Sequence, residues 1–196
     1  MSKQRKEKIL IVDDEENIRK SLRMIFEYDD YTVLEAADGE EALKTIDETV
    51  GLDLVLLDIK LPGLDGLEVL AELKKRPYSP EVIMISGHGT VHTAVEATKL
   101  GAFDFFEKPL HRERVLLSIR NALSQNRLAR AMSVPPRRIN EIVHGKRAVT
   151  ADTAIRLALA LGTSEQFWMG LQADFDLEEA KKSVQKELNK IENLAA

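Results

Sequence analysis

The fold is decided by Leu54-Val55-Leu56-Leu57-Asp58-Ile59-Lys60-Leu61-Pro62-Gly63, in which four apolar residues run directly into one acid and a Pro-Gly turn follows. A short apolar run bounded by a turn is typical of a strand that is buried on both faces in a parallel sheet. Open parallel sheets carry their ligand sites at the carboxyl ends of the strands. The sequence therefore predicts that Asp58 lies at the functional edge of a sheet.

Four further apolar runs flank this stretch and alternate with amphipathic helical patterns. They cover residues 8–12, 32–36, 82–85 and 103–106. Strands that alternate with helices at a spacing of about 20–25 residues are typical of an α/β fold with a doubly wound parallel sheet. We predict a flavodoxin-like five-stranded sheet in the order 2-1-3-4-5, which sets the ends of strands one and three side by side.

Two more acids, Asp13 and Asp14, directly follow the first apolar run. In the predicted strand order they share one crevice with Asp58. Three carboxylates at such short range repel one another unless a cation lies among them. Mg²⁺ suits a site with few hard oxygen ligands, because it keeps several of its waters. The sequence thus predicts a magnesium site formed by these three acids.

Composition narrows the class of protein. The 196 residues include no cysteine, which excludes disulfides and cysteine-based catalysis or metal binding. The polar, basic N-terminus lacks the apolar core of a signal peptide, and no apolar run is long enough to span a membrane, so we expect a cytoplasmic protein without membrane contact. Residues 111–156 hold 10 basic and 3 acidic residues within a chain of net charge −5. This block predicts either a polyanion contact or a solvated face.

From Ile9 to about Arg127 the sequence resembles a response-regulator receiver domain. The motifs that carry the resemblance occur in receiver order and spacing, and the part from Ser86 to Leu110 is particularly similar to the NtrC/NtrX branch of these regulators. The motifs are V-D-D-E at 12–15, L-L-D-I-K-L-P-G at 56–63, I-S-G-H-G at 85–89 and F-E-K-P-L at 106–110. The resemblance implies a CheY-like fold and a sensor histidine kinase as partner.

The resemblance also implies a role for each residue of the acidic crevice. Asp58 would be the phosphoacceptor. Asp14 and Asp58, with the backbone carbonyl of Lys60, would bind Mg²⁺ directly, and Asp13 would hold a water on the metal. Lys108 would pair with the oxygens of the incoming phosphoryl group, where a fixed positive charge meets developing negative charge.

Two further residues would report phosphorylation to the rest of the domain. By the resemblance, Ser86 supplies the hydroxyl that moves toward the phosphoryl group, and Phe105 is the aromatic switch. The alternatives are that Ser86 caps a helix and that Phe105 is a core residue. A cis bond between Lys108 and Pro109 would direct the lysine side chain at the site, although few X–Pro bonds are cis.

The second half of the sequence predicts short helices joined by tight turns. A helical segment at 124–131 ends before Val134-Pro135-Pro136, and a short Arg-rich helix follows, which is typical of a helix-turn-helix. From Ser124 to about Glu179 the sequence resembles the Xre/HigA antitoxin family, through L-A-R-A at 128–131, P-P-R-R-I-N-E-I at 135–142, G-K-R at 145–147 and F-W at 167–168. The resemblance implies a small all-α helix-turn-helix domain that sets residues 136–144 in the major groove of double-stranded DNA.

That placement yields two sets of candidate DNA contacts. The set that would read base edges is Arg137, Arg138, Asn140 and Glu141, because Arg suits guanine and Asn suits adenine. The set that would contact phosphates or support the first helix is Gln125, Lys146 and Arg147. For Arg138 and Glu141 an intramolecular salt bridge is the alternative.

One departure from the Xre pattern concerns the join between the halves. The family has a helix before the one that starts near Ser124, and here the last receiver helix, 111–123, occupies that place without a linker. That helix either replaces the missing one or runs on into the next. We predict a receiver domain at 1–123, a helix-turn-helix domain at 124–176 and a C-terminal helix at 177–196. This last helix carries an apolar residue at every seventh position, namely Leu177, Val184 and Ile191. The repeat predicts either self-association or packing on the chain's own body.

Taken together, these patterns predict a two-component response regulator that is not an enzyme. A histidine kinase would phosphorylate Asp58, and a homodimer would bind a two-fold DNA site to control transcription. Two alternatives differ in class. In one, the Xre-like part binds a protein partner rather than DNA. In the other, the chain is a phosphatase-like enzyme or a phosphate sink.

Overall fold

The computed structural model describes residues 5–76, 79–87 and 90–188. The chain divides into two compact units, Met1–Asn140 and Glu141–Ala196, and each is described by itself. The elements in chain order are β1 (Lys8–Val12), α1 (Glu16–Tyr28), β2 (Thr32–Ala36), α2 (Gly39–Glu48), β3 (Leu54–Asp58), α3 (Gly66–Lys74), β4 (Glu81–Ser86), α4 (Val91–Leu100), β5 (Asp104–Glu107), α5 (Arg112–Ala131), α6 (Pro136–Val143), α7 (Ala151–Leu161) and α8 (Glu165–Leu188).

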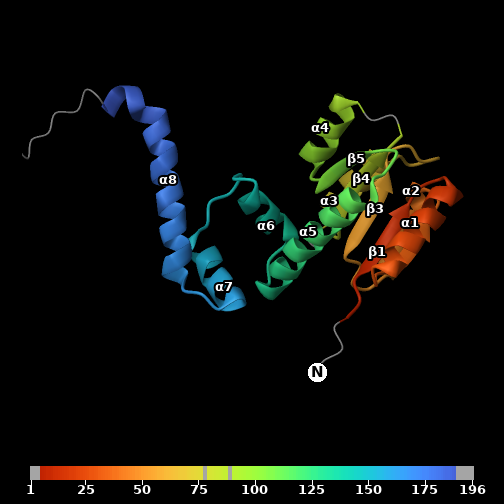
Figure 1. The fold of residues 1–196 in the computed structure, drawn as a ribbon, viewed down its shortest axis with the longest axis horizontal. Coiled ribbons are helices and arrows are strands. Elements are labelled where there is room, and N and C mark those ends of the chain that lie inside the picture. The colour runs from red at the N-terminus through yellow and green to blue at the C-terminus, as the bar shows by residue number, and fades with distance from the viewer. Residues whose placement is uncertain (1–4, 77–78, 88–89, 189–196) are drawn as a thin grey trace, which may run out of the picture. The chain divides into compact units, whose positions relative to one another are not determined.

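The five strands form one parallel sheet in the order β2-β1-β3-β4-β5, which confirms the predicted topology (Figure 1). The register pairs Val12 of β1 with Leu57 of β3. Asp13 and Asp58 each follow directly, so the two acids lie at the same level on neighbouring strands. The sheet topology therefore brings together residues that are 45 positions apart in the chain.

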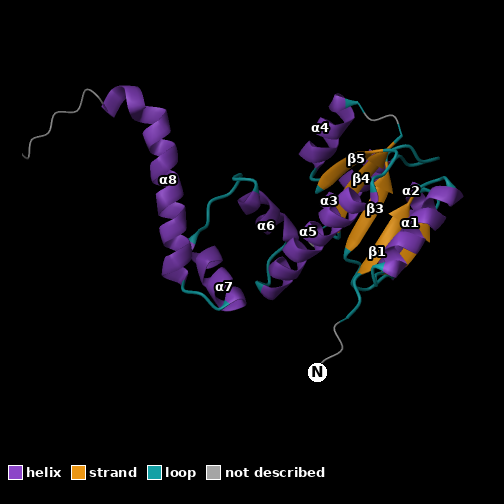
Figure 2. Cartoon of the chain, viewed as in Figure 1, coloured by secondary structure: helices purple, strands orange, loops and turns teal. Residues whose placement is uncertain are grey.

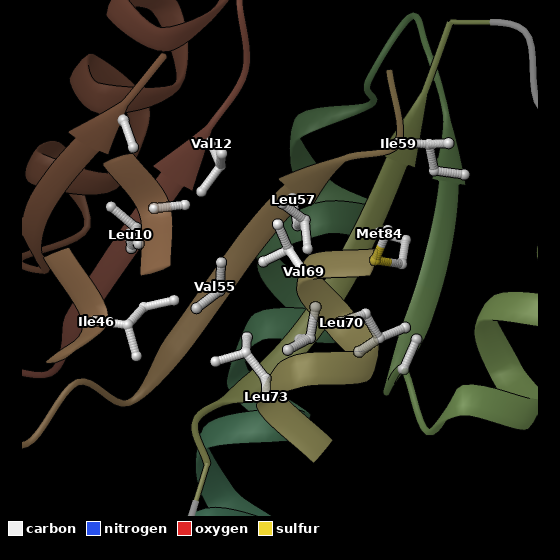
Figure 3. Close-up of a cluster of buried hydrophobic side chains, with 14 of the residues drawn as sticks. Leu10, Val12, Ile46, Val55, Leu57, Ile59, Val69, Leu70, Leu73 and Met84 are labelled. Carbon is white, nitrogen blue, oxygen red and sulfur yellow. The ribbon is translucent and has the colours of Figure 1, made fainter. Parts of the chain in front are cut away.

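Apolar side chains project from both faces of the sheet, and each face forms one hydrophobic core with the helices that cover it. One core joins the sheet to α2, α3 and α4, and Figure 3 shows Val55 and Leu57 of β3 directed toward Val69 and Leu73 of α3. The other core joins the sheet to α1 and α5. All five residues of β3 are buried, because a central parallel strand is covered on both faces.

Polar caps begin the helices that follow the strands. Asp65 and Glu68 form a reciprocal capping box at the start of α3. Thr90 accepts a hydrogen bond from the N–H of Thr93 at the start of α4, and Gly101, with a φ of 98°, ends that helix in the left-handed conformation that glycine favours. Helix α3 ends at Lys74.

Helix α5 is one uninterrupted helix, Arg112–Ala131 (Figure 2). Of the two arrangements that the sequence left open, the structure shows the continuous one. Leu123 is 2% exposed and packs in the same core as α1 and the sheet. The predicted join between Leu123 and Ser124 thus lies within a helix, and the assignment of separate functions on either side of it stays a prediction.

The second unit consists mainly of α7 and α8. Helix α8 continues without a break from Glu165 to Leu188, so the C-terminal helix predicted from Leu177 is the later part of a longer one. Ile191 of the predicted seven-residue repeat lies outside the described residues. Across the described ranges, no helix is both long enough and apolar enough to cross a membrane.

Candidate functional site

Three carboxylates meet at the carboxyl edge of the sheet. Asp13, Asp14 and Asp58 each offer one oxygen, and these oxygens all lie within 4.8 Å of one another. Asp13 and Asp58 are buried, at 0% and 3% exposed, whereas Asp14 is exposed. The crevice predicted from the strand order therefore exists, with two of its acids inside the protein and one facing solvent.

Lys108 projects into this group of acids from the end of β5. Its Nζ donates to Asp58 Oδ2 at 2.6 Å and lies 2.8 Å from Asp13 Oδ2 and 3.5 Å from Glu15 Oε1. The Lys108 N–H donates to the Ser86 carbonyl at 2.8 Å, and the bond between Lys108 and Pro109 is cis, as expected. The hydrogen bond to Ser86 holds the backbone of the lysine while its side chain extends to the acids.

The electrostatics of the crevice follow from burial and from charge pairing. Burial disfavours the charged form of Lys108, but its interactions with the carboxylates of Asp13 and Asp58 outweigh burial and raise the pKa of the ammonium group. Burial raises the pKa of the Asp13 carboxyl, against the lowering effect of Lys108 and of the Glu15 N–H. The site therefore holds a fixed positive charge beside acids that are poorly hydrated.

The donor set fits Mg²⁺. Asp13 Oδ1 accepts from the Glu15 N–H at 2.9 Å. Asp13 Oδ2 is buried and has no hydrogen-bond partner among the described residues, although Lys108 Nζ lies 2.8 Å from it as an ion pair. A buried carboxylate oxygen without a hydrogen bond is a natural ligand for a cation. Asp14 and Asp58 add hard oxygen atoms within reach of the same point.

The other predicted residues of this site lie around the acids. The Lys60 N–H donates to Asp58 Oδ1 at 3.2 Å, which holds the carboxylate in place. Ser86 ends β4 and is 2% exposed. Phe105 is partly buried against the core that contains α3 and α4. The roles of the Lys60 carbonyl, the Ser86 hydroxyl and the Phe105 ring stay predictions.

Sequence reasoning missed two residues that shape this edge. The Arg19 guanidinium donates to the carbonyls of Asp13 and Asp14 at 2.6 and 3.2 Å and so anchors the acidic loop. Gly66 begins α3 against β3, and a Cβ added there would lie 2.0 Å from the Asp58 carbonyl oxygen. The glycine after Asp65 was a visible signal, but only the packed loop shows why a side chain cannot fit.

A third missed residue, Asp53, lies at the opposite, amino-terminal edge of the sheet. It is 3% exposed, and its carboxylate accepts from the Lys8 N–H and from Arg5 and contacts Arg130 of α5, each at 2.8 Å. Its backbone carbonyl accepts from Asn126 of α5 at 3.0 Å. The part of α5 that was assigned to the helix-turn-helix domain is therefore bound to the receiver sheet.

Four predicted DNA contacts belong to the first unit. Arg137 is exposed, whereas Arg138 and Asn140 are partly buried, and all three are on α6 around the buried Ile139. Burial is the main cause that lowers the pKa of the Lys74 ammonium on α3, and the charge of nearby Arg137 lowers it further. Gln125 lies on α5, and its Oε1 is buried without a hydrogen-bond partner among the described residues. The roles of these residues in binding DNA stay predictions.

Three predicted DNA contacts belong to the second unit. Arg147 Nε donates to Glu141 Oε2 at 2.8 Å, and the N–H groups of Lys146 and Arg147 donate to the Glu141 carbonyl. Glu141 thus makes the intramolecular salt bridge that was the alternative to base reading. Lys146 and Arg147 are both exposed.

Two family comparisons match the chain. The sequence model of the response regulator receiver domain matches residues 9–120, more than half of the chain. A helix-turn-helix model matches residues 117–168. The two matches overlap inside α5, which lies within the first unit.

Individual proteins agree with these matches. The nitrogen assimilation regulatory protein NtrX of Azorhizobium caulinodans is 44% identical over 124 residues, which are 62% of this chain and 27% of that protein. The uncharacterized transcriptional regulatory protein YkoG of Bacillus subtilis is 42% identical over 118 residues, 60% of this chain and 51% of that protein. The crystal structure of the receiver domain of NtrX from Brucella abortus is 43% identical, has a TM-score of 0.56 and covers 59% of this chain and 98% of that chain. This chain thus spans only about a quarter to a half of the length of these two sequence relatives.

Proposed function

Because the chain belongs to the response regulator receiver domain family, we propose that it is a two-component response regulator that controls transcription by binding DNA. The observation that carries the proposal is the contact of Lys108 Nζ with Asp58 at 2.6 Å and Asp13 at 2.8 Å, in a crevice with a third acid. A sensor histidine kinase would supply the phosphoryl group, and a helix-turn-helix would deliver the output.

In the proposed reaction, a carboxylate oxygen of Asp58 attacks the phosphorus atom of a phosphohistidine on the kinase. An O–P bond forms, the P–N bond breaks, and the histidine nitrogen keeps the electron pair. Lys108 lies where negative charge develops on the phosphoryl oxygens, and its raised pKa keeps it protonated. The Lys60 N–H holds Asp58 Oδ1, which leaves the other oxygen to react.

Mg²⁺ would be bound by Asp14, Asp58 and the Lys60 carbonyl, with Asp13 holding a water on the metal. The ion would screen the negative charges of nucleophile and phosphoryl group from each other. Lys108 then remains as the only positive side chain of the described site within 4 Å of Asp58. Its ammonium group would move from the acids to the phosphoryl oxygens as the reaction proceeds.

The phosphorylation step is tested with a small acyl phosphate as donor and phosphate-affinity gels as the measurement. Asp58→Asn should abolish the shifted band, and chelation of divalent cations should do the same to the wild-type protein. Asp47→Asn is the matched control, because Asp47 is an exposed acid that pairs with Arg76 away from the site. Equal phosphorylation of Asp58→Asn and wild type would overturn the assignment of the phosphoacceptor.

For the output, Arg137 is the most informative candidate, because it is exposed on the Arg-rich helix α6. Duplexes selected from a random pool by the wild-type protein provide the probe. Arg137→Ala should weaken specific binding by about tenfold, as one good base contact is worth roughly 1–3 kcal/mol. Arg127→Ala on α5 is the matched control, because its described contacts are with Glu7 and Ser124. The absence of any bound duplex at low salt would instead favour the protein-binding alternative.

The switch itself is tested by comparing DNA affinity with and without beryllofluoride, a phosphoryl mimic, for the wild type and Asp58→Ala. The proposal requires a change in the wild-type protein that Asp58→Ala lacks. If neither the mimic nor the substitution changes the DNA affinity, DNA binding and Asp58 are uncoupled.

A further inference from the structure

The later part of α8 projects beyond the packing of its own unit. Trp168 Nε1 donates to the Thr163 hydroxyl, and the Val149 N–H donates to Gln172, which fixes the start of the helix. From Ala173 to Val184 every residue is exposed, and the hydrogen bonds that the structure describes there are all internal to the helix. A helical segment of this length is marginally stable in water by itself, so a partner surface is expected.

One face of this segment carries an apolar stripe. Ala173, Leu177, Ala180 and Val184 follow one another at spacings of four, three and four residues. That spacing places them on one face of a helix, in the a and d positions of a coiled coil. Leu177 is 57% exposed and Val184 36% exposed, so the stripe is uncovered.

The sizes of these residues favour one orientation of a second copy. The large residues, Leu177 and Val184, occupy the a positions, and the small ones, Ala173 and Ala180, occupy the d positions. In a parallel pair, large residues face large ones and small residues face small ones, so successive layers of side chains need different distances between the two helices. In an antiparallel pair each a residue faces a d residue, and every layer joins one large and one small side chain.

Charge supports the antiparallel arrangement. Four acids precede two lysines along the exposed segment, namely Asp174, Asp176, Glu178 and Glu179 before Lys181 and Lys182. The helix macrodipole does not account for this order, because its effect fades within the first turn and the acids lie beyond the second. A parallel pair would align the acid-rich segments, although it could set Asp176 near the partner's Lys181. An antiparallel pair sets each acid-rich segment beside the partner's lysines.

We propose that α8 pairs with α8 of a second copy of the chain as a short antiparallel coiled coil. Leu177 faces the partner's Ala180, and Ala173 faces the partner's Val184. The same register brings Asp174, which flanks the stripe, beside the partner's Lys181. The pair is two-fold symmetric, so every contact occurs twice. This pairing would supply the homodimer that the sequence predicts. It rests on the proposed DNA-binding function for its purpose, but not for its geometry.

Cross-linking tests the register directly, because the full chain has no cysteine. Ala173→Cys and Val184→Cys are prepared with tags of different size, mixed and mildly oxidised. The proposal predicts a disulfide between the two variants when mixed and at least fivefold less product from either variant alone. A disulfide needs Cβ atoms roughly 3.5–4.5 Å apart, so a wrong register does not react. Phe175→Cys with Lys182→Cys is the matched control, at the same level on the opposite face of the helix.

Each other outcome overturns the proposal. Cross-linking of each variant with itself means a parallel pair, and no product in any mixture means that the stripe packs on the chain's own body. Sedimentation provides a second measurement: Leu177→Asp should be a monomer, whereas Phe175→Asp should keep the wild-type mass. Acyl phosphate labelling of the same samples separates the hypotheses. Normal labelling of Asp58 without cross-links overturns the coiled coil and leaves the proposed phosphorylation intact.

Discussion

Gly66 determines how closely α3 approaches the end of β3, where Asp58 lies. A Cβ at this position would lie 2.0 Å from the Asp58 carbonyl oxygen and 2.9 Å from the Ile59 Cα, both backbone atoms that cannot turn aside. The Gly66 N–H also donates to the Ile59 carbonyl at 2.9 Å, so the loop is held at this short distance. The smallest residue is therefore required beside the backbone of Asp58.

Replacing Gly66 with alanine should accordingly harm both stability and phosphorylation. We expect a loss of about 2–3 kcal/mol in the free energy of unfolding, as for other overpacked sites, together with slower labelling of Asp58. Urea unfolding and acyl phosphate labelling are the measurements. The control is Gly170→Ala on α8, where nothing lies within 4 Å of the added Cβ and a neutral or slightly stabilising effect is expected. Equal effects of the two substitutions would contradict the role of the close approach.

Lys108 occupies the position that a cation would share with the three acids. In Lys108→Ala the acids lose their positive partner, so their repulsion rises and a divalent cation relieves more of it. We expect Mg²⁺ to bind roughly tenfold or more tightly to this variant, given the size of charge interactions at this range, while phosphorylation slows. Titration calorimetry measures the affinity. Lys60→Ala, which removes an exposed lysine beside the same acids, should change the affinity much less.

At the scale of elements, a buried ion pair joins α3 to β4. Lys74 Nζ lies 4.0 Å from Glu81 Oε2, and the Glu81 side chain is 3% exposed. Burial raises the pKa of the Glu81 carboxyl above its ordinary 4.5, against the effect of Lys74. Burial also lowers the pKa of the Lys74 ammonium below its ordinary 10.5, against the effect of Glu81. Both groups are therefore harder to ionise in the folded than in the unfolded chain.

The sign of the pH dependence follows from these directions. For Glu81, the folded state holds its proton to higher pH, so its contribution to stability is lost as pH rises from 4.5 through the raised pKa. Glu81→Gln should remove that loss. It also leaves Lys74 without its partner and lowers the lysine pKa further, so stability should rise with pH on the approach to 10.5. Urea unfolding from pH 4 to pH 10 would show the change of slope, and parallel curves for variant and wild type would contradict it.

The elements also show what sequence patterns can and cannot predict. The five strands were predictable because each is a short apolar run followed by a turn signal, and the acids at their ends pointed to the site. The continuous α5 was left open because neither a helix stop nor a helix start stands at Leu123–Ser124. The role of Asp53 was not predictable, since its partners Arg5, Asn126 and Arg130 are brought together only by the folded sheet edge. The Glu141–Arg147 pair was one of two stated alternatives.

At the scale of the whole molecule, the first compact unit extends past the receiver match. It runs to Asn140, whereas the receiver match ends at residue 120. Ala129, Met132 and Val134 are all buried, although they belong to the stretch predicted as helix-turn-helix. The end of α5 and the chain beyond it, as far as Asn140, are thus part of the compact unit that contains Asp58.

A truncation at Leu123 should therefore be less stable than one at Asn140. The shorter chain lacks the Asn126 and Arg130 contacts with Asp53 and exposes apolar surface, so we expect a deficit of about 2–4 kcal/mol in the free energy of unfolding. Urea unfolding of the two fragments is the comparison, and Asn126→Ala should destabilise the longer fragment by part of the same amount. Equal stabilities would mean that the end of α5 adds nothing to the receiver.

The attachment of α5 at Asp53 also constrains how this output could be exchanged for another. A helix turns by about 100° per residue, so one residue inserted between Leu123 and Asn126 would rotate everything downstream and carry Asn126 and Arg130 away from Asp53. An insertion of seven residues would restore the phase to within about 20° but shift it along the axis by roughly two turns. A chimera that keeps these contacts, and with them the rotational position of its DNA-binding part, must therefore be joined after Arg130. That junction lies inside residues 117–168, which the family match assigns to the helix-turn-helix.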